Sequence, residues 1–352
     1  MNRIKVKQVL IAAAGVALLT GAAFAADISG AGATFPYPIY SKWADAYKQQ
    51  TGIGLNYQSI GSGGGIKQIK AKTVTFGASD MPLKPEELKE AGLVQFPMII
   101  GGVVPVVNIK GVAANQLVLD GPTVAAIYLG EITKWDDARI KKLNPKLTLP
   151  GTNIAPISRS DGSGTNFLFS NYLASTSPKF QSSIGAATSV QWPVGIGAKG
   201  NEGVANMTRQ TDGAIGYVEY AYAKQTQMPT AELINKAGKT VAPNAEAFQA
   251  AAANADWAHA DGYYLILTDQ AGAQSWPITG ASFILVYGTP PDAAATNEAL
   301  KFFDWAYKNG GKMAAELDYV PLPDALIKQV RATWKAQIKG ATVASTADAT
   351  RM

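Results

Sequence analysis

Strand-like and helix-like segments alternate along this chain of 352 residues, with turns of small residues between them. Residues 27–32 predict a short strand, and a helix with apolar residues at helical spacing follows it. Residues 54–60 predict a second strand, which leads through the glycine turn 61–65 into a second helix. Residues 73–78 predict a third strand, which ends just before Asp80. This alternation predicts an α/β fold with parallel strand pairing.

Two longer apolar runs predict crossings between two such α/β units. The run 96–108 is rich in β-branched residues and predicts one or two buried strands, with Gly101 and Gly102 allowing a bend. The run 282–287 predicts the return strand. We therefore predict two α/β lobes joined by two crossover strands. Lobe I comprises residues 26–106 and 281–345, lobe II comprises residues 107–280, and residues 346–352 form a flexible tail.

Further elements follow from the same patterns. In lobe II the sequence predicts helices at 122–128 and 165–174 and strands at 154–158 and 214–219. After the return strand, amphipathic helices at 297–309 and 325–338 are predicted to pack back on lobe I.

The first 25 residues have the order of a secretory signal peptide. A basic start precedes the apolar run 10–19, and Ala23-Phe24-Ala25 provides small residues at both positions of a cleavage site. The apolar run is shorter than the roughly 20 residues that span a bilayer. We expect cleavage after Ala25 and a periplasmic mature protein, with a retained membrane anchor as the alternative. The basic residues are Arg3, Lys5 and Lys7.

Charge and residue content exclude several classes of protein. The formal net charge of +5 includes three positive charges in the signal peptide, so the mature chain stays near +2. A clustered basic face of the kind that binds nucleic acid is therefore not expected. The chain has no cysteine, and its single histidine, His259, argues against a zinc site. We predict no metal and no cofactor.

Three predicted helix starts combine small residues with hydroxyl groups, at residues 33–35, 61–64 and 161–165. The first turn of a helix has unpaired backbone N–H groups and a partial positive charge. Glycine lets an oxyanion approach the backbone, and serine or threonine adds a hydroxyl donor. Starts that converge from both lobes would bind a tetrahedral oxyanion. The alternative is that each is only a capped helix, and Thr34 suits the role of N-cap.

Arg159 and Asp161 stand just before the third of these helix starts. Arginine presents a planar fork of donors to an anion, and the carboxylate of Asp161 would hold that fork in position. The alternative for this pair is a surface ion pair beside a turn.

Asp80 is an acidic residue that would repel an anion unless the anion carries a proton. Protonated phosphate has an O–H to donate, whereas sulfate has none. A carboxylate in the cleft would therefore reject sulfate by leaving a buried charge unpaired. The alternative is that Asp80 caps a helix over residues 83–91.

Seven segments carry a resemblance to a known family, and they are GAGATFPYPIY at 30–40, IGSGGGIKQI at 60–69, TFGASDMPL at 75–83, GEITKWDD at 130–137, SRSDGSGT at 158–165, GAIGYVEYAYAKQ at 213–225 and KFFDWAYKNGGK at 301–312. They closely resemble the periplasmic phosphate-binding proteins of bacterial phosphate ABC transporters, in the same order and over essentially the whole mature chain. The resemblance implies a type II periplasmic-binding-protein fold whose two lobes close over the ligand. It also implies no enzymatic activity, and delivery of phosphate to the permease subunits of an ABC transporter.

The resemblance further implies a phosphate site that both lobes share. Asp80 would accept the proton of the phosphate, and Arg159, coupled to Asp161, would donate to its oxygens. The remaining implied donors are Thr34, Phe35 and Ser62 of lobe I, and Ser163, Gly164 and Thr165 of lobe II. Arsenate is expected to bind as an analogue, and the protein is expected to be a monomer.

Two other functions stay open on the residues alone. An exported phosphatase or other hydrolase would need a metal cluster or a G-x-S-x-G elbow, and neither Gly61-Ser62 nor Gly162-Ser163 has the first glycine of that elbow. A receptor for another oxyanion, such as sulfate, molybdate or a phosphonate, would keep the same fold. The sequence assigns no role to Glu219, and His259 is interpreted as a surface or packing residue.

Overall fold

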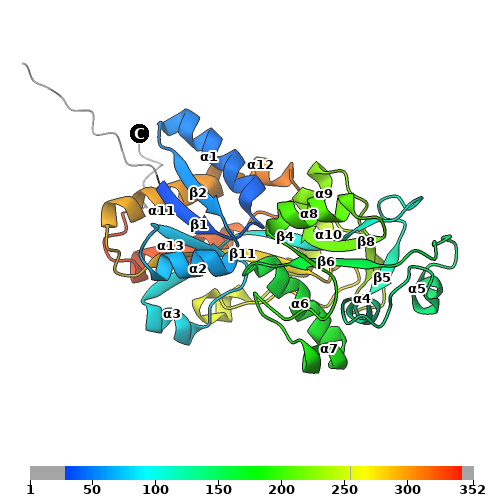
Figure 1. Ribbon diagram of the computed structural model, residues 1–352. Coiled ribbons are helices and arrows are strands. Elements are labelled where there is room, and N and C mark those ends of the chain that lie inside the picture. Colours follow the sequence, from blue (N-terminus) through cyan, green and yellow to red (C-terminus); the bar gives the residue numbers. More distant parts are fainter. Residues whose placement is uncertain (1–27, 254, 343–352) are drawn as a thin grey trace, which may run out of the picture.

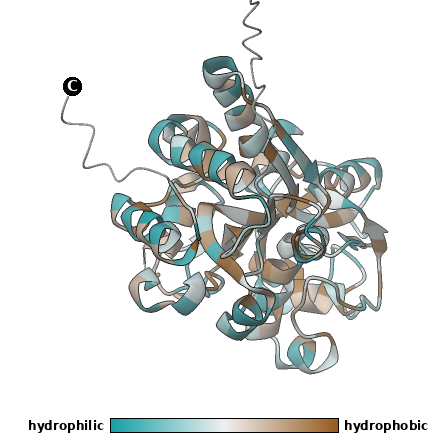
Figure 2. Ribbon diagram, turned by 90° about the vertical axis from the view of Figure 1, so that its left-hand side faces the viewer, coloured by the Kyte–Doolittle hydropathy of each residue, from teal (hydrophilic) through white to brown (hydrophobic). Residues whose placement is uncertain are grey.

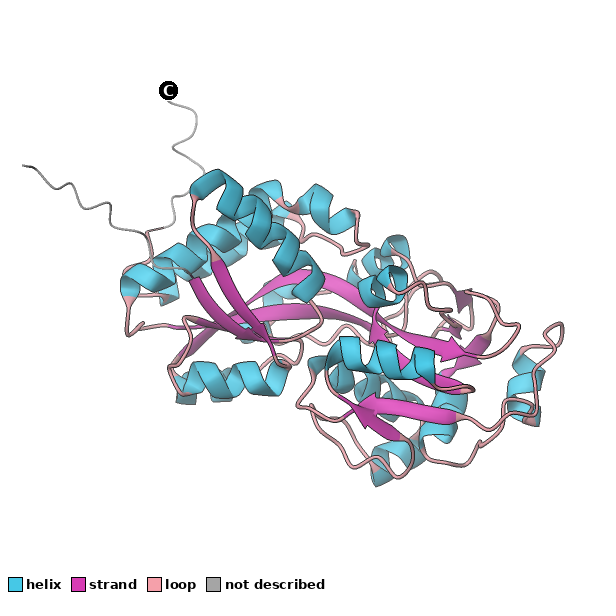
Figure 3. Ribbon diagram, turned by 45° about the horizontal axis from the view of Figure 1, so that its top comes forward, coloured by secondary structure: helices cyan, strands magenta, loops and turns pink. Residues whose placement is uncertain are grey.

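The computed structural model describes residues 28–253 and 255–342, and the predicted signal peptide and tail lie outside them. The described part contains an eight-stranded sheet, in the order β2-β1-β3-β11-β4-β8-β6-β7, and a three-stranded sheet, in the order β10-β9-β5. The strands are β1 (Ile28–Gly32), β2 (Leu55–Ser59), β3 (Phe76–Ser79), β4 (Leu93–Asn108), β5 (Val118–Asp120), β6 (Ala155–Arg159), β7 (Ile196–Ala198), β8 (Ala214–Glu219), β9 (Glu232–Ile234), β10 (Thr240–Val241) and β11 (Thr279–Tyr287). Helices surround the strands (Figure 1; Figure 3), as an α/β fold requires.

Strand direction differs between the outer and the central parts of the large sheet. β1 pairs in parallel with β2 and β3, and β6 pairs in parallel with β7 and β8. The central strands β4 and β11 pair antiparallel with each other, and antiparallel with β8 and β3 on either side. Parallel pairing is therefore confirmed for the outer strands. The central strands break it because one leaves lobe I and the other returns to it.

β4 is the first crossover, as predicted, and it is a single strand. Its residues 93–102 pair with β11, and its residues 103–108 pair with β8 (Figure 1). The change of partner falls directly after Gly101 and Gly102. A Cβ on Gly102 would lie 2.1 Å from the ring of Phe248, and one on Gly101 would lie 3.0 Å from the ring of Phe35. These glycines therefore make room for two aromatic rings inside an unbroken strand.

The segment Trp257–Tyr263 packs on lobe I, although the predicted boundary places it in lobe II. The Gln95 amide donates to the Gly262 carbonyl at 2.8 Å, and the Tyr263 and Thr333 hydroxyl oxygens lie 2.8 Å apart. The Trp257 ring lies 6.3 Å from the ring of Phe283. We propose that lobe II runs from about residue 103 to about residue 256, since pairing and packing both change there.

The helices bury apolar faces against the sheet, and Figure 2 shows the apolar strands (brown) at the centre with hydrophilic helix surfaces (teal) outside. The C-terminal helices pack on lobe I as predicted: Phe303 meets Phe76, and Trp334 meets Phe96, each with ring centroids 5.0 Å apart. The helices are α1 (Tyr37–Thr51), α2 (Ser62–Lys70), α3 (Pro85–Ala91), α4 (Gly121–Tyr128), α5 (Ala138–Leu143), α6 (Gly164–Thr176), α7 (Pro178–Ser183), α8 (Gly200–Gln210), α9 (Tyr220–Gln225), α10 (Ala245–Ala252), α11 (Ala293–Asn309), α12 (Gly311–Ala315) and α13 (Asp324–Gln337), with short 3₁₀ turns η1 (Trp257–His259) and η2 (Asp261–Tyr263). In the part of the chain that the structure describes, no helix is long and apolar enough to cross a membrane.

Candidate functional site

The first turns of α2 and α6 meet at the side chain of Ser62. The Ser62 hydroxyl oxygen accepts the backbone N–H of Asp80 at 3.0 Å and that of Gly164 at 3.0 Å. A Cβ on Gly164 would lie 2.5 Å from the Ser62 Oγ and 2.5 Å from the Asp80 Cβ. Only glycine therefore allows these two helix starts, one from each lobe, to approach so closely.

The lobes also touch through their backbones, and the cleft is closed. The Gly63 N–H donates to the Gly162 carbonyl at 2.9 Å. Gly61 has a φ of +88°, and a Cβ there would lie 2.4 Å from the Asp161 carboxylate. The two glycine-rich segments that the sequence analysis singled out are therefore brought together, face to face.

Arg159 is held rigidly at the end of β6. Its Nε and Nη2 donate to the two carboxylate oxygens of Asp161 at 2.8 and 2.6 Å, and its backbone N–H donates to the Tyr217 hydroxyl at 3.0 Å. The Arg159 side chain is 1% exposed, so the alternative of a surface ion pair is wrong. Its Nη1 is buried and has no hydrogen-bond partner among the described residues.

Asp161 is fully engaged as the partner of Arg159. The Gly200 backbone N–H also donates to its Oδ1, at 3.1 Å. Burial alone would raise the pKa of Asp161, but the hydrogen bonds and charge of Arg159, together with the Gly200 N–H, hold that pKa below its ordinary value. Asp161 therefore stays ionised.

Asp80 lies directly after β3 and is buried. It is not a helix cap, because α3 begins at Pro85 and its first turn is closed by Lys84 and Glu87. Its Oδ2 lies 3.4 Å from the Ser62 hydroxyl, and its Oδ1 is buried with no hydrogen-bond partner in the described chain. Burial raises the pKa of Asp80 to about 7, against the opposing effects of the Ser282 hydroxyl, the Arg159 charge and the Ser62 hydroxyl.

Thr34 and Phe35 form a turn before α1 and are both buried. The alternative role of Thr34 as N-cap of α1 is wrong, because Pro36 takes that position without a side-chain cap. The Thr34 carbonyl accepts the Tyr222 hydroxyl at 2.6 Å, and the Phe35 carbonyl accepts the Tyr319 hydroxyl at 2.6 Å. The two tyrosine hydroxyl groups thus fix the orientation of both peptide planes of the turn.

Asn201, in the first turn of α8, is a member of this cluster that the sequence analysis missed. Its Nδ2 lies 2.7 Å from the Thr34 Oγ1 and 3.2 Å from the Thr165 Oγ1, so that it links two of the predicted residues. A signal was present in the sequence. Residues 196–201 form a further strand end, small-residue turn and helix start.

Ser163 differs from the other predicted donors. It is the N-cap of α6, and its hydroxyl oxygen accepts the Asn166 N–H at 3.0 Å. Its own backbone N–H donates to the Thr188 carbonyl at 2.8 Å. The Ser163 side-chain hydroxyl still has a hydrogen to donate, whereas its backbone N–H is already used.

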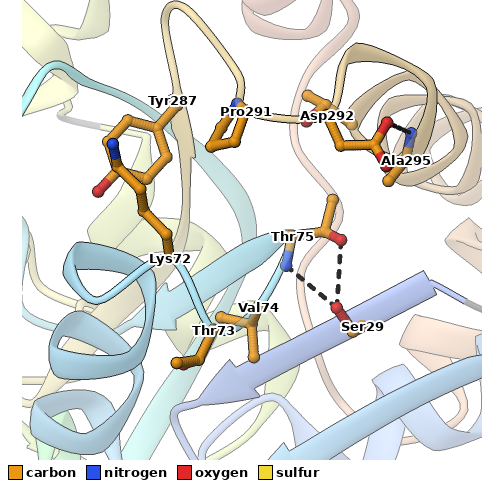
Figure 4. A pocket seen from close by; sticks show the side chains of 10 residues that line it. Ser29, Lys72, Thr73, Val74, Thr75, Tyr287, Pro291, Asp292 and Ala295 are labelled. Atoms are coloured by element: carbon orange, nitrogen blue, oxygen red, sulfur yellow. Dashed lines mark hydrogen bonds between the residues drawn. The ribbon is translucent and has the colours of Figure 1, made fainter.

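Other candidate sites carry less chemistry. Within the described ranges no group of three or more His, Cys, Asp or Glu residues could hold a metal ion. His259 is exposed and pairs with Asp256 at 2.8 Å. A surface pocket beside Lys72 and Tyr287 (Figure 4) includes no residue of the predicted site, and the Ser29 and Thr75 hydroxyl oxygens in it lie 3.1 Å apart.

Comparison with known proteins identifies the family to which the chain belongs. A model described as the PBP superfamily domain matches residues 20–309. The phosphate-binding protein PstS of Pasteurella multocida is 54% identical over 315 residues, which cover 90% of this chain and 92% of that protein. The PstS of Xylella fastidiosa is 54% identical over 312 residues, or 89% and 86% of the two chains. A solved phosphate-binding protein from Stenotrophomonas maltophilia is 21% identical, with a TM-score of 0.68 over 89% of this chain and 96% of that one, and shows the type II periplasmic-binding-protein fold.

Proposed function

We propose a function from the premise that the chain belongs to the PstS family of phosphate-binding proteins. The protein binds inorganic phosphate in the cleft between its lobes and delivers it to a phosphate ABC transporter. It is a binding protein and not an enzyme.

One observation carries the location of the phosphate. An ionised Asp80 carboxylate accepts hydrogen bonds but cannot donate them, whereas the Arg159 guanidinium donates but cannot accept. Asp80 Oδ1 and Arg159 Nη1 are both buried without a partner among the described residues. A buried polar atom without a hydrogen bond costs about 1–3 kcal/mol, so each calls for a partner. Hydrogen phosphate supplies both: its O–H donates to Asp80, and its oxygens accept from Arg159.

The same pair explains why phosphate would be chosen over sulfate. Sulfate could accept from Arg159, but it has no hydrogen for Asp80. The Asp80 carboxylate would then be buried facing a second negative charge, which is strongly unfavourable. Arsenate has a similar shape and a similar O–H, so it binds at the same place in this proposal.

The remaining contacts complete the site as proposed. Thr34, Ser62, Ser163 and Thr165 donate through their hydroxyl groups, and Phe35 and Gly164 donate through backbone N–H groups. Asp161 holds Arg159, and Asn201 holds Thr34 and Thr165. The Gly164 N–H donates to the Ser62 hydroxyl oxygen in this structure. When phosphate is bound, it would donate to the anion as well as to Ser62, or to the anion instead.

Export and assembly complete the proposal. The signal peptide is cleaved after Ala25, the mature protein is a periplasmic monomer, and it docks on the permease subunits of the transporter. It takes no part in nucleic-acid binding.

Titration calorimetry of the mature protein, freed of bound phosphate by unfolding and refolding, tests this function. Phosphate and arsenate should bind with one-to-one stoichiometry, and sulfate should not compete at millimolar concentration. Equal binding of sulfate and phosphate would contradict the proposed role of Asp80. A failure to bind phosphate at all would overturn the function.

A further inference from the structure

Three oxygen atoms lie in a row behind the Thr34–Phe35 turn. The Tyr319 hydroxyl oxygen lies 2.6 Å from the Phe35 carbonyl oxygen on one side and 2.8 Å from the Glu219 Oε2 on the other. Tyr319 follows α12, whereas Glu219 ends β8, and both residues are fully buried. The row therefore joins lobe II to the turn of lobe I.

A count of the hydrogens that this row requires indicates that Glu219 is protonated. Two oxygen–oxygen contacts of 2.6 and 2.8 Å each require a hydrogen between them. Tyr319 has one hydroxyl hydrogen, and the Phe35 carbonyl has none. If Glu219 were ionised, one of the two contacts would have no hydrogen, and lone pairs on its two oxygens would repel each other. A proton on Glu219 completes the chain, in which Glu219 donates to Tyr319 and Tyr319 donates to Phe35.

The surroundings of Glu219 favour the same protonation state. The groups that face it are Tyr319 after α12, Tyr220 and Tyr222 on α9, and Asp80 after β3, none of which carries positive charge. Lys224 of α9 is paired with Asp318. Burial raises the pKa of Glu219 well above its ordinary value, although the Tyr319 hydroxyl and the N–H groups of Ala221 and Tyr220 act in the opposite direction.

Glu219 also reaches the other half of the turn. Its backbone N–H donates to the Asn201 Oδ1 at 2.8 Å, which directs the Asn201 amide hydrogens toward Thr34. Its Oε1, which has no hydrogen-bond partner among the described residues, faces the crossover strand, where a Cβ on Gly101 would lie 3.2 Å away. One residue thus supports Phe35 through its side chain and Thr34 through its backbone.

We propose that Glu219 is a positioning residue of the anion site, carrying a proton when the lobes are closed and fixing the Thr34–Phe35 turn through Tyr319 and Asn201. The inference rests on the proposed function, because the turn matters only if it binds the anion. A neutral Glu219 stabilises the closed form in two ways. It supplies the missing hydrogen, and it keeps a second negative charge away from Asp80 and the phosphate.

Infrared difference spectroscopy tests the protonation directly. At pH 7 the wild-type protein should show the C=O stretch of a protonated carboxyl group that is lost in Glu219→Gln and retained in Asp80→Asn. If no such band is lost in Glu219→Gln, Glu219 is ionised and the inference is overturned. This result does not depend on phosphate binding, so it is distinct from a failure of the proposed function.

Phosphate affinity then tests the positioning role. Glu219→Gln keeps the residue neutral and should bind within about threefold of wild type, because at most one hydrogen bond is rearranged. Glu219→Ala and Tyr319→Phe both break the row and should each weaken binding by about tenfold. The double variant Glu219→Gln/Tyr319→Phe should weaken phosphate binding no more than Tyr319→Phe alone does.

The matched control is Glu232→Gln on β9, which removes another carboxylate whose pKa burial raises. It should leave phosphate affinity unchanged. If Glu219→Gln weakens binding as much as Glu219→Ala, the negative charge is required and the inference fails. If Tyr319→Phe binds like wild type, the row has no positioning role.

Discussion

Asp80 and Asp161 are carboxylates of the same cleft that lie in opposite environments. Asp161 gives both oxygens to Arg159 and Gly200, and its pKa is lowered. Asp80 has one oxygen without a partner in the described structure, and burial raises its pKa to about 7. The side chain of Asp161 is 15% exposed, whereas Asp80 is 1% exposed as a whole.

The difference separates a supporting residue from a proposed binding residue. Asp161 satisfies its hydrogen bonds inside the protein, within lobe II, so it stabilises the orientation of Arg159. Asp80 Oδ1 has no partner among the described residues, and we propose that it accepts the hydrogen of the bound phosphate. A residue type alone does not decide between these roles, and the partners available in the folded protein do.

The largest effect should follow from making Asp80 unable to carry charge. Asp80→Asn removes the unpaired negative charge that sulfate would face, so the preference for phosphate over sulfate should fall by about a hundredfold. Competition calorimetry measures this preference, with Asp161→Asn as the control. An unchanged preference in Asp80→Asn would show that another group makes the discrimination.

A methyl group at the point where Asp80 meets α6 should act nearly as strongly. Gly164→Ala places a Cβ 2.5 Å from both Ser62 and Asp80, so the lobes cannot close fully and phosphate affinity should fall roughly 10- to 100-fold. Gly203→Ala in α8 is a matched control, since its Cβ would meet only Ala198 at 3.6 Å. Wild-type affinity in Gly164→Ala would mean that binding does not need this closed contact.

Changing the cation that both carboxylates face should have a smaller effect. Arg159→Lys keeps the charge but loses the planar fork that donates to Asp161 and leaves Nη1 for the anion, so affinity should fall by about tenfold. The pKa of Asp161 should rise in the same variant, and NMR titration of its carboxyl carbon measures that change. An unaltered Asp161 pKa would show that Arg159 does not stabilise it.

The smallest effects should appear in folding stability, with opposite dependence on pH. Asp161 has a lowered pKa in the folded state, so its stabilising contribution is present at neutral pH and lost as pH falls through that pKa. Asp80 has a raised pKa, so its ionisation lowers the free energy of unfolding of the wild-type protein as pH rises from about 4 toward about 7.

Urea unfolding of the phosphate-free variants between pH 4 and pH 8 measures both trends. Asp161→Asn should be less stable than wild type at pH 7, with a gap that narrows in acid. Asp80→Asn should become more stable relative to wild type as pH rises. If the free energy of unfolding changed with pH in the same way in both variants, Asp80 and Asp161 would not lie in opposite environments.

Much of the fold could be predicted because local patterns decide it. The apolar run of β4 and the helical spacing of α11 and α13 were sufficient to predict a crossover strand and two helices on lobe I. The predicted boundary and the proposed one differ over Trp257–Tyr263, because its contacts to Gln95 and Thr333 join residues far apart in the chain. Asn201 was missed because its partners Thr34 and Thr165 are 167 and 36 residues away in the chain.

By itself the sequence determined the α/β architecture, the glycine-rich helix starts and the family, since periodicity, turn residues and motif order are local properties of the chain. Only the tertiary structure decided which polar groups are satisfied. Asp80 and Asp161 are the same residue type, and each follows the end of a strand. The partner of Asp161 is Arg159, only two residues before it in the chain, whereas the packing of the two lobes buries Asp80 and leaves its Oδ1 without a partner among the described residues. Burial and hydrogen bonding across the cleft depend on contacts between distant segments, and no local pattern encodes them.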